Sequence, residues 1–281
     1  MHSYQGQCYP SLQEVPNEIL AAFIQQNVLS ETIAIHKNKL VYWEEHYLRL
    51  MASMRILRME IPLTFTLEFL AQKIDELRAH HTASSQGKVT ISVVKMGTPS
   101  LQHPIPSTAY SISIAPVQEA FFGHKTVNQP IDLYKDHYAA SGLFSSLESA
   151  AQQWRNMAWT FVIENDYCDG ILLNNDKQLV ETLHGSLFLV KGNEVSTPAL
   201  DQGCRKTVYR SQLIRFLNQS NDFDLKEDAI SPFSIQKADE VFVLVDGTAI
   251  YSVPQYRKKK FSTSMTKIIH EGFSSQITQQ L

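Results

Sequence analysis

Three ionisable side chains in this sequence are of types that could do chemistry. Arg49 carries a guanidinium, which binds phosphate oxygens through paired hydrogen bonds. Glu148 carries a carboxylate, which can act as a general base in an apolar pocket, and His46 is a candidate acid–base partner. No lysine occurs between Lys135 and Lys177, so this segment offers no amine for a Schiff base.

No spacing among these residues specifies a reaction by itself. The sequence shows no Ser-His-Asp arrangement and no cluster of metal ligands. Its three cysteines, Cys8, Cys168 and Cys204, are too far apart for a zinc site or a disulfide framework. Isolated cysteines of this kind are typical of free thiols packed inside a protein of the reducing cytoplasm. Taken alone, Arg49 fits an arginine on the exposed face of a helix.

The composition is typical of a soluble globular protein. The 281 residues suit one large domain or two modest ones, and 43% of them are hydrophobic. The net charge of -3 argues against a nucleic-acid surface, and the basic run 257–260 is typical of a solvated turn or strand end. No apolar stretch approaches the roughly 20 residues that span a bilayer, and the N-terminus lacks a signal-peptide pattern. We therefore expect a cytoplasmic protein without nucleic-acid or membrane partners.

Periodicity predicts the elements that position these side chains in the first half. Residues 31–35 and 40–42 are predicted strands around a turn, and residues 89–93 and 110–114 alternate as half-buried strands do. Residues 80–87 and 99–106 are predicted loops. Two helices are predicted, the first stopped by Pro62 and the second capped by Thr64. Their apolar stripes are Trp43, Tyr47, Leu50, Met54 and Leu57, and then Leu67, Leu70, Ile74 and Leu77.

The second half is predicted to start with a helix over about 147–165, which would place Glu148 at its first turn. Strands are predicted at 170–173, 186–190, 241–245 and 249–253, and a helix at 208–218. Gly192-Asn193 and Asp246-Gly247 are hairpin signals. The breakers in 116–130 indicate a linker, with domains at 1–115 and 131–281.

Several stretches, in this order along the chain, resemble the fold-type IV enzymes that depend on pyridoxal phosphate (PLP). They are Glu31-Thr32, residues 45–50, residues 168–174, Val180-Glu181, residues 187–190, Thr197-Pro198, Gly203-Cys204, Arg210 and residues 238–242. The family holds branched-chain aminotransferases, D-amino-acid aminotransferases and aminodeoxychorismate lyases. The resemblance covers nearly the whole chain. It implies a mixed α+β fold with a small N-terminal α/β domain and a larger barrel-like C-terminal domain. It also implies a homodimer.

The resemblance implies roles for particular residues. Arg49 matches the arginine that holds the cofactor phosphate, and Glu181 matches the glutamate that keeps the pyridine nitrogen protonated. Thr207 and Val208 lie in the turn that offers backbone N–H groups to the phosphate, with Thr207 in place of the usual glycine. Glu148 stands where the family has its Schiff-base lysine, and a carboxylate cannot form that bond.

Further positions depart from the family pattern. The expected tyrosine is Gln153, the expected asparagine is Ser186, and a threonine that contacts phosphate is Leu244. The resemblance makes His46 a helix residue that supports the fold.

Two hypotheses about function stay open. In the first, the chain has no PLP chemistry, binds no cofactor, and acts as a scaffold or captures a small anionic metabolite. In the second, it is an active PLP-dependent aminotransferase or 4-amino-4-deoxychorismate lyase that uses a displaced lysine such as Lys206. A third possibility is different chemistry with Glu148 as a general base.

Overall fold

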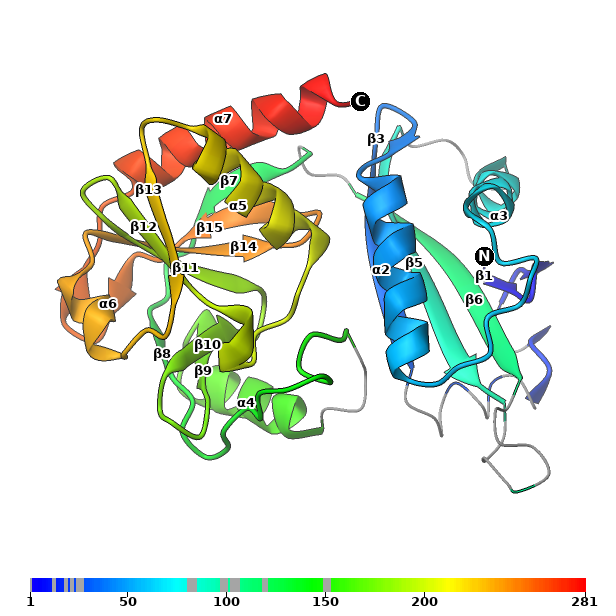
Figure 1. Cartoon of the computed structure of the whole chain (residues 1–281), viewed down its shortest axis with the longest axis horizontal. Coiled ribbons are helices and arrows are strands. Elements are labelled where there is room, and N and C mark those ends of the chain that lie inside the picture. Colours follow the sequence, from blue (N-terminus) through cyan, green and yellow to red (C-terminus); the bar gives the residue numbers. More distant parts are fainter. Residues whose placement is uncertain are drawn as a thin grey trace. The chain divides into compact units, whose positions relative to one another are not determined.

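The chain divides into two compact units in a computed structural model (Figure 1). The structure describes residues 2–11, 14–17, 20, 23, 28–79, 85–96, 101, 107–117, 121–148 and 153–281. The first unit comprises Met1–Glu119 and Glu148–Ala151, and the second comprises Ala120–Leu147 and Gln152–Leu281. Most of the predicted loops at 80–87 and 99–106 lies outside the described residues, and residues 86–87 are in a strand and not in a loop.

A six-stranded antiparallel sheet forms the frame of the first unit, in the order β2-β1-β6-β5-β3-β4. The strands are β1 (His2–Tyr4), β2 (Gln7–Tyr9), β3 (Leu29–His36), β4 (Lys39–Leu40), β5 (Gln86–Lys95) and β6 (Thr108–Pro116). The predicted alternation along 89–93 is confirmed, because Val89, Ile91 and Val93 are buried while the residues between them are half-buried.

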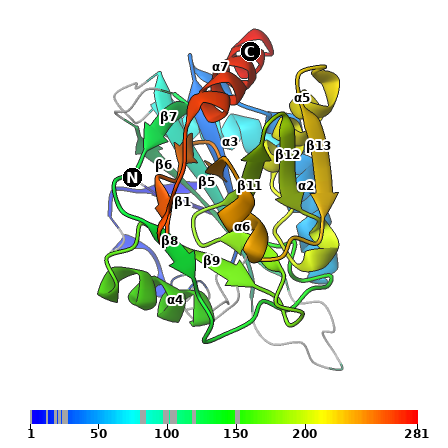
Figure 2. The same ribbon diagram turned by 90° about the vertical axis from the view of Figure 1, so that its left-hand side faces the viewer.

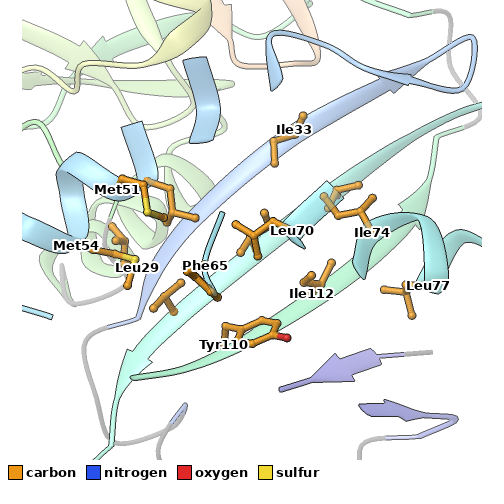
Figure 3. Packing of buried hydrophobic residues seen from close by; sticks show 14 of the residues in the cluster. Leu29, Ile33, Met51, Met54, Phe65, Leu70, Ile74, Leu77, Tyr110 and Ile112 are labelled. Carbon is orange, nitrogen blue, oxygen red and sulfur yellow. The ribbon is translucent and has the colours of Figure 1, made fainter. Parts of the chain in front are cut away.

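Two helices, α2 (Trp43–Ile56) and α3 (Leu67–Ala79), pack against this sheet. Figure 3 shows Leu70, Ile74 and Leu77 of α3 among side chains of the strands, including Ile112. The apolar stripes predicted from helical spacing are therefore the faces that the helices bury.

The cap of α3 is Thr66 and not the predicted Thr64. The Thr66 hydroxyl accepts a hydrogen bond from the amide of Phe69 at 3.2 Å. The preceding residues form a turn in which the amide of Phe65 donates to the carbonyl of Pro62 at 2.9 Å. This turn buries Phe65 and delays the helix start by two residues beyond the position that the sequence predicted.

Two sheets form the second unit, in the orders β10-β9-β8-β16-β17 and β13-β12-β11-β14-β15-β7. Their strands are β7 (Gly123–Thr126), β8 (Ile131–Leu133), β9 (Asp169–Leu173), β10 (Leu179–Thr182), β11 (Ser186–Lys191), β12 (Glu194–Pro198), β13 (Asp224–Asp228), β14 (Glu240–Val245), β15 (Ala249–Ser252), β16 (Gln255–Tyr256) and β17 (Lys259–Lys260). One core cluster joins Ile171 and Leu179 of the first sheet to Leu187, Val241 and Val243 of the second. The two sheets thus enclose a common core, as in a barrel.

Both predicted hairpins are present. Gly192-Asn193 connects β11 to β12 with Lys191 opposite Glu194, and residues 246–248 connect β14 to β15 with Val245 opposite Ala249. Gly192 and Gly247 have φ angles of +60° and +58°, a region that favours glycine. Strand β7 lies within the segment 116–130 and pairs with β15 in parallel.

The helices of the second unit are α4 (Gln153–Glu164), α5 (Val208–Gln219), α6 (Phe233–Lys237) and α7 (Ser264–Gln279). Figure 2 shows α4 beside β9, and α5 and α7 both pack on β14. None of the helices in the described part of the chain has the length and apolarity that crossing a membrane requires.

The helix predicted over about 147–165 is shorter than expected at its start. Leu147 and Glu148 are not helical, and residues 149–152 lie outside the described part. The hydroxyls of Ser145 and Ser146 donate to carbonyls three residues earlier, at 2.7 and 3.1 Å, and such local bonds compete with a helix. The carbonyl of Glu148 instead accepts from the amide of Ser30 at 3.1 Å.

We expect Leu70→Ala to lower the free energy of unfolding of the first unit by about 2–5 kcal/mol, since it opens a cavity in a packed core. Leu70 is 0% exposed, whereas Leu63, on the preceding turn, is 99% exposed. Leu63→Ala is therefore the matched control, with an expected change within about 0.5 kcal/mol. Urea unfolding followed by circular dichroism measures both, and equal effects would contradict the packing described for α3.

Candidate functional site

The arginine matched to the cofactor phosphate, Arg49, is held by a carboxylate of its own unit. Its Nη1 donates to both oxygens of Glu31 in β3, each at 2.9 Å. His46 lies one turn earlier on the same face of α2 and places Nδ1 2.6 Å from Glu31 Oε1. Glu31 and His46 are buried, and the Arg49 side chain is 14% exposed. Strand β3 and helix α2 are thus joined by a polar contact beside the core, in which His46 supports the fold.

Glu181, at the centre of β10, is 1% exposed and is surrounded by two arginines. Nη2 of Arg155, from α4, donates to its Oε1. Nε of Arg205, from the loop before α5, lies 3.0 and 3.1 Å from the two carboxylate oxygens, and the backbone N–H of Arg205 donates to Oε2 at 3.1 Å. We call Arg155, Glu181 and Arg205 the arginine cluster.

The arginine cluster keeps the Glu181 carboxyl ionised. Burial alone would raise its pKa, but the charges of Arg205 and Arg155 and the backbone N–H of Arg205 together hold the pKa below its ordinary value. The carboxylate that the resemblance assigns to the pyridine nitrogen therefore has protein cations as its partners.

The start of α5, matched to the phosphate turn, is closed by a side-chain contact. The Thr207 hydroxyl accepts from the amide of Arg210 at 3.2 Å, so Thr207 is the N-cap. The same hydroxyl donates to Oδ1 of Asp246 at 2.8 Å, and Val208 is the buried first residue of the helix. A carboxylate is the charge that a helix N-terminus favours, and here the chain supplies it from the β14–β15 turn.

Glu148 and Lys206 are the two remaining residues to which the sequence assigned a possible role in the chemistry. Glu148 is half-buried in the first unit and follows the irregular residues 142–147. Lys206 is exposed, between Arg205 and the N-cap of α5.

The other positions at which the sequence departs from the family pattern lie in the second unit. Gln153 is the first residue of α4, while Ser186 and Leu244 face each other as buried partners of β11 and β14. Leu244 is 0% exposed, as its apolar run predicted. The described part of the chain holds no group of three or more side chains suited to a metal ion.

The sequence patterns did not indicate Arg155 or the roles of Glu31 and Asp246. Arg155 lies 26 residues before Glu181, on a helix that packs beside the strand, so no local spacing links the two. The available signal was composition, because Arg155 is the single basic residue of the otherwise apolar and neutral run before Glu164. That signal does not identify the partner, because a charge that becomes buried can pair with an anion on any neighbouring element.

Comparison with known proteins decides the family. The family model described as "Amino-transferase class IV" matches residues 29–255. The chain belongs to the class IV aminotransferases. No curated protein matches its sequence. The match of the family model confirms the family that the sequence motifs predicted.

Solved structures of aminotransferases and of a putative lyase share the fold. A branched-chain aminotransferase from Thermoproteus uzoniensis, bound to norvaline, superposes with a TM-score of 0.83 at 17% identity, over 98% of this chain and 94% of that one. A putative 4-amino-4-deoxychorismate lyase from Legionella pneumophila gives 0.74 at 19% identity, over 92% and 93%. An aminotransferase from Brucella abortus, bound to PLP, gives 0.79 at 13% identity, over 99% and 98%. The predicted mixed α/β fold of this class IV chain is confirmed, with its two-domain arrangement.

We expect Glu181→Gln to lower the free energy of unfolding at pH 7 by about 3–5 kcal/mol, because it leaves buried guanidinium charge without its carboxylate. The folded pKa of Glu181 is depressed below 4.5, so its contribution is complete above that pH and is lost as the pH falls through the folded pKa. The difference between the two proteins should therefore shrink on acidification.

Glu194→Gln is the control for this experiment. Glu194 pairs with Lys226 on the surface, where both side chains are more than a third exposed, and little change is expected. Denaturant unfolding between pH 3 and 7 compares the variants. An unchanged or growing difference at low pH would contradict an ionised Glu181.

Proposed function

We propose that this class IV homologue does not carry out PLP-dependent transamination and acts as a small-molecule-binding or scaffold protein. The observation that carries the proposal is the arginine cluster, in which Arg155 and Arg205 bind the buried carboxylate of Glu181. In the family pattern this carboxylate serves the cofactor's pyridine nitrogen.

The arginine cluster fits PLP poorly. A pyridinium can approach Glu181 only if it displaces a guanidinium from a 1% exposed carboxylate. Each hydrogen bond to a charged group is worth roughly 1.5–3 kcal/mol, and Arg205 makes two kinds of contact, through Nε and through its backbone N–H. The displaced cation would also have to be solvated elsewhere.

The start of α5 supports the same conclusion. A phosphate bound there would face the Asp246 carboxylate that Thr207 holds at 2.8 Å from its hydroxyl. Two like charges about 4 Å apart repel by roughly 4 kcal/mol at an effective dielectric constant near 20. Arg49, the other phosphate ligand of the family pattern, is engaged by both oxygens of Glu31.

The Schiff base between PLP and a lysine also lacks its amine at the position where the family pattern has it. Glu148 stands at the lysine position, and the sequence has no lysine between residues 135 and 177. The competing hypothesis uses Lys206, next to the arginine cluster. Lys206 is exposed, and it does not stand at the position where the family pattern has its Schiff-base lysine, which is occupied by Glu148.

The ligand that we propose is a small anionic metabolite, and the assembly that we propose is a homodimer. Guanidinium groups recognise carboxylates and phosphates, and the side chains of Arg155 and Arg205 keep 17% and 12% exposure. Light scattering tests the dimer separately from any ligand.

Incubation with PLP tests the lost cofactor chemistry. We expect no rise in melting temperature and no adduct after borohydride reduction. A PLP concentration of about 100 times the dissociation constant would stabilise a binding protein by about 2.7 kcal/mol. Glu148→Lys alone should stay without visible adduct absorbance, because Glu181 and Thr207 keep their protein partners.

Glu148→Gln is the matched control, since it removes the charge without adding an amine. Lys206→Ala separates the two hypotheses. A reduced adduct on wild-type protein that disappears in Lys206→Ala would establish the competing hypothesis. Cofactor absorbance gained by Glu148→Lys would contradict the conclusion that the pocket no longer fits PLP.

A further inference from the structure

A small cavity lies in the second unit, beside the start of β9, and its lining residues do not include those of the arginine cluster. The space open to the centre of a water molecule is about 70 Å³. One water needs roughly 10–15 Å³ on this measure, so the cavity holds several waters or a ligand of a few carbon atoms. Most of its wall is apolar, from Val127, Val243, Val245, Val253 and the ring of Tyr251.

One side of the cavity is polar and built around Asp169. This residue is 4% exposed, and its Oδ1 accepts from the amides of Gly170 at 2.8 Å and Leu183 at 3.1 Å. Its Oδ2 lies 3.3 Å from Nδ1 of His184, which also lines the cavity. Asp169 is therefore fixed by the backbone and in turn orients the imidazole.

The orientation of His184 leaves one ring nitrogen for a ligand. A carboxylate beside Nδ1 favours a proton on that nitrogen, and in the tautomer with that proton Nε2 is an acceptor. No described residue makes a hydrogen bond to Nε2, and the side chain is 48% exposed. Trp159 packs edge-to-face on the imidazole, with ring centroids 4.4 Å apart, and limits its rotation.

The charge around the cavity selects against ions. The Asp169 carboxylate repels an anion. It attracts a cation, but its oxygens are already engaged by the amides of Gly170 and Leu183 and by His184, and the cation would lose its hydration against four valines. Burial and the Asp169 charge raise the pKa of the Cys168 thiol, which also lines the cavity, to about 12. Cys168 therefore remains a protonated thiol and is not a nucleophile for the ligand.

We propose that this cavity binds a small neutral molecule with a short apolar body and one hydroxyl group, which donates to Nε2 of His184. The apolar body replaces water against the valines, and the hydroxyl satisfies the ring nitrogen that Asp169 orients. The site shares no residue with the arginine cluster, so it is independent of the proposed function.

Three probes with one carbon skeleton test the charge selection. Isobutanol is neutral, isobutyrate is an anion and isobutylammonium is a cation. The full chain, labelled with ¹⁵N in its three tryptophans, reports binding through the indole signal of Trp159 beside His184, assigned with Trp159→Phe. We expect a saturable shift with isobutanol and none with the two ions. No saturable shift with isobutanol, or an equal response to all three probes, overturns the proposal.

Two substitutions that fill the cavity locate the site. Val245→Phe at the end of β14 and Val127→Phe outside the strands should each weaken isobutanol binding at least tenfold, measured by the same titration. Ile163→Phe, at a 73% exposed position of α4, is the control and should leave binding unchanged. If isobutanol binds both filling variants as tightly as the wild type, while melting curves show that they fold, the assignment to this cavity is wrong.

His184→Phe tests the hydrogen bond. Phenylalanine keeps a ring against Trp159 but has no acceptor, and one net hydrogen bond corresponds to a loss of about two- to tenfold in affinity. Unchanged affinity in a folded His184→Phe protein overturns the role of Nε2.

Discussion

The ionised carboxylate of Glu181 is the constraint on which the organisation of the second unit depends. A buried charge must be paired and hydrogen-bonded, and Glu181 meets this need from two different segments. Arg155 ties it to α4, while Arg205 ties it to the loop before α5 through both its side chain and its backbone. The carboxylate thus fixes where that loop runs and where α5 begins.

The position of α5 then sets a second contact. Because Arg205 is anchored, Thr207 two residues later stands at the helix start, where its hydroxyl caps α5 and reaches Asp246 in the β14–β15 turn. The first unit repeats this organisation on a smaller scale, with the Glu31 carboxylate between His46 and Arg49. In each unit, side chains that the family pattern assigns to a cofactor have partners from the same unit.

Local pattern predicted the elements but not these contacts. Alternation along residues 89–93 and the Gly192-Asn193 signal were sufficient, because each depends on neighbours in sequence. The start of α4 was mispredicted, since the serines near 145 bond to nearby carbonyls and the helical pattern of apolar residues does not register that competition. Resemblance indicated Glu181, but Arg155 comes from a separate element and could be found only in three dimensions. The cavity at His184 depends likewise on strands that are distant in sequence.

Three buried carboxylates of the second unit show why the arginine cluster matters. Asp169 is satisfied mainly by backbone amides, and Glu240 accepts from amides and hydroxyls at the start of α7, with the Thr266 amide at 2.8 Å. Such donors are neutral and belong to the fold, so these two carboxylates need no further cation. Glu181 instead pairs with positively charged side chains. In the family pattern, a protonated pyridine nitrogen supplies the positive charge beside this carboxylate. Arg155 and Arg205 therefore supply charge of that same sign from the protein itself, and they explain how Glu181 stays ionised although it is buried.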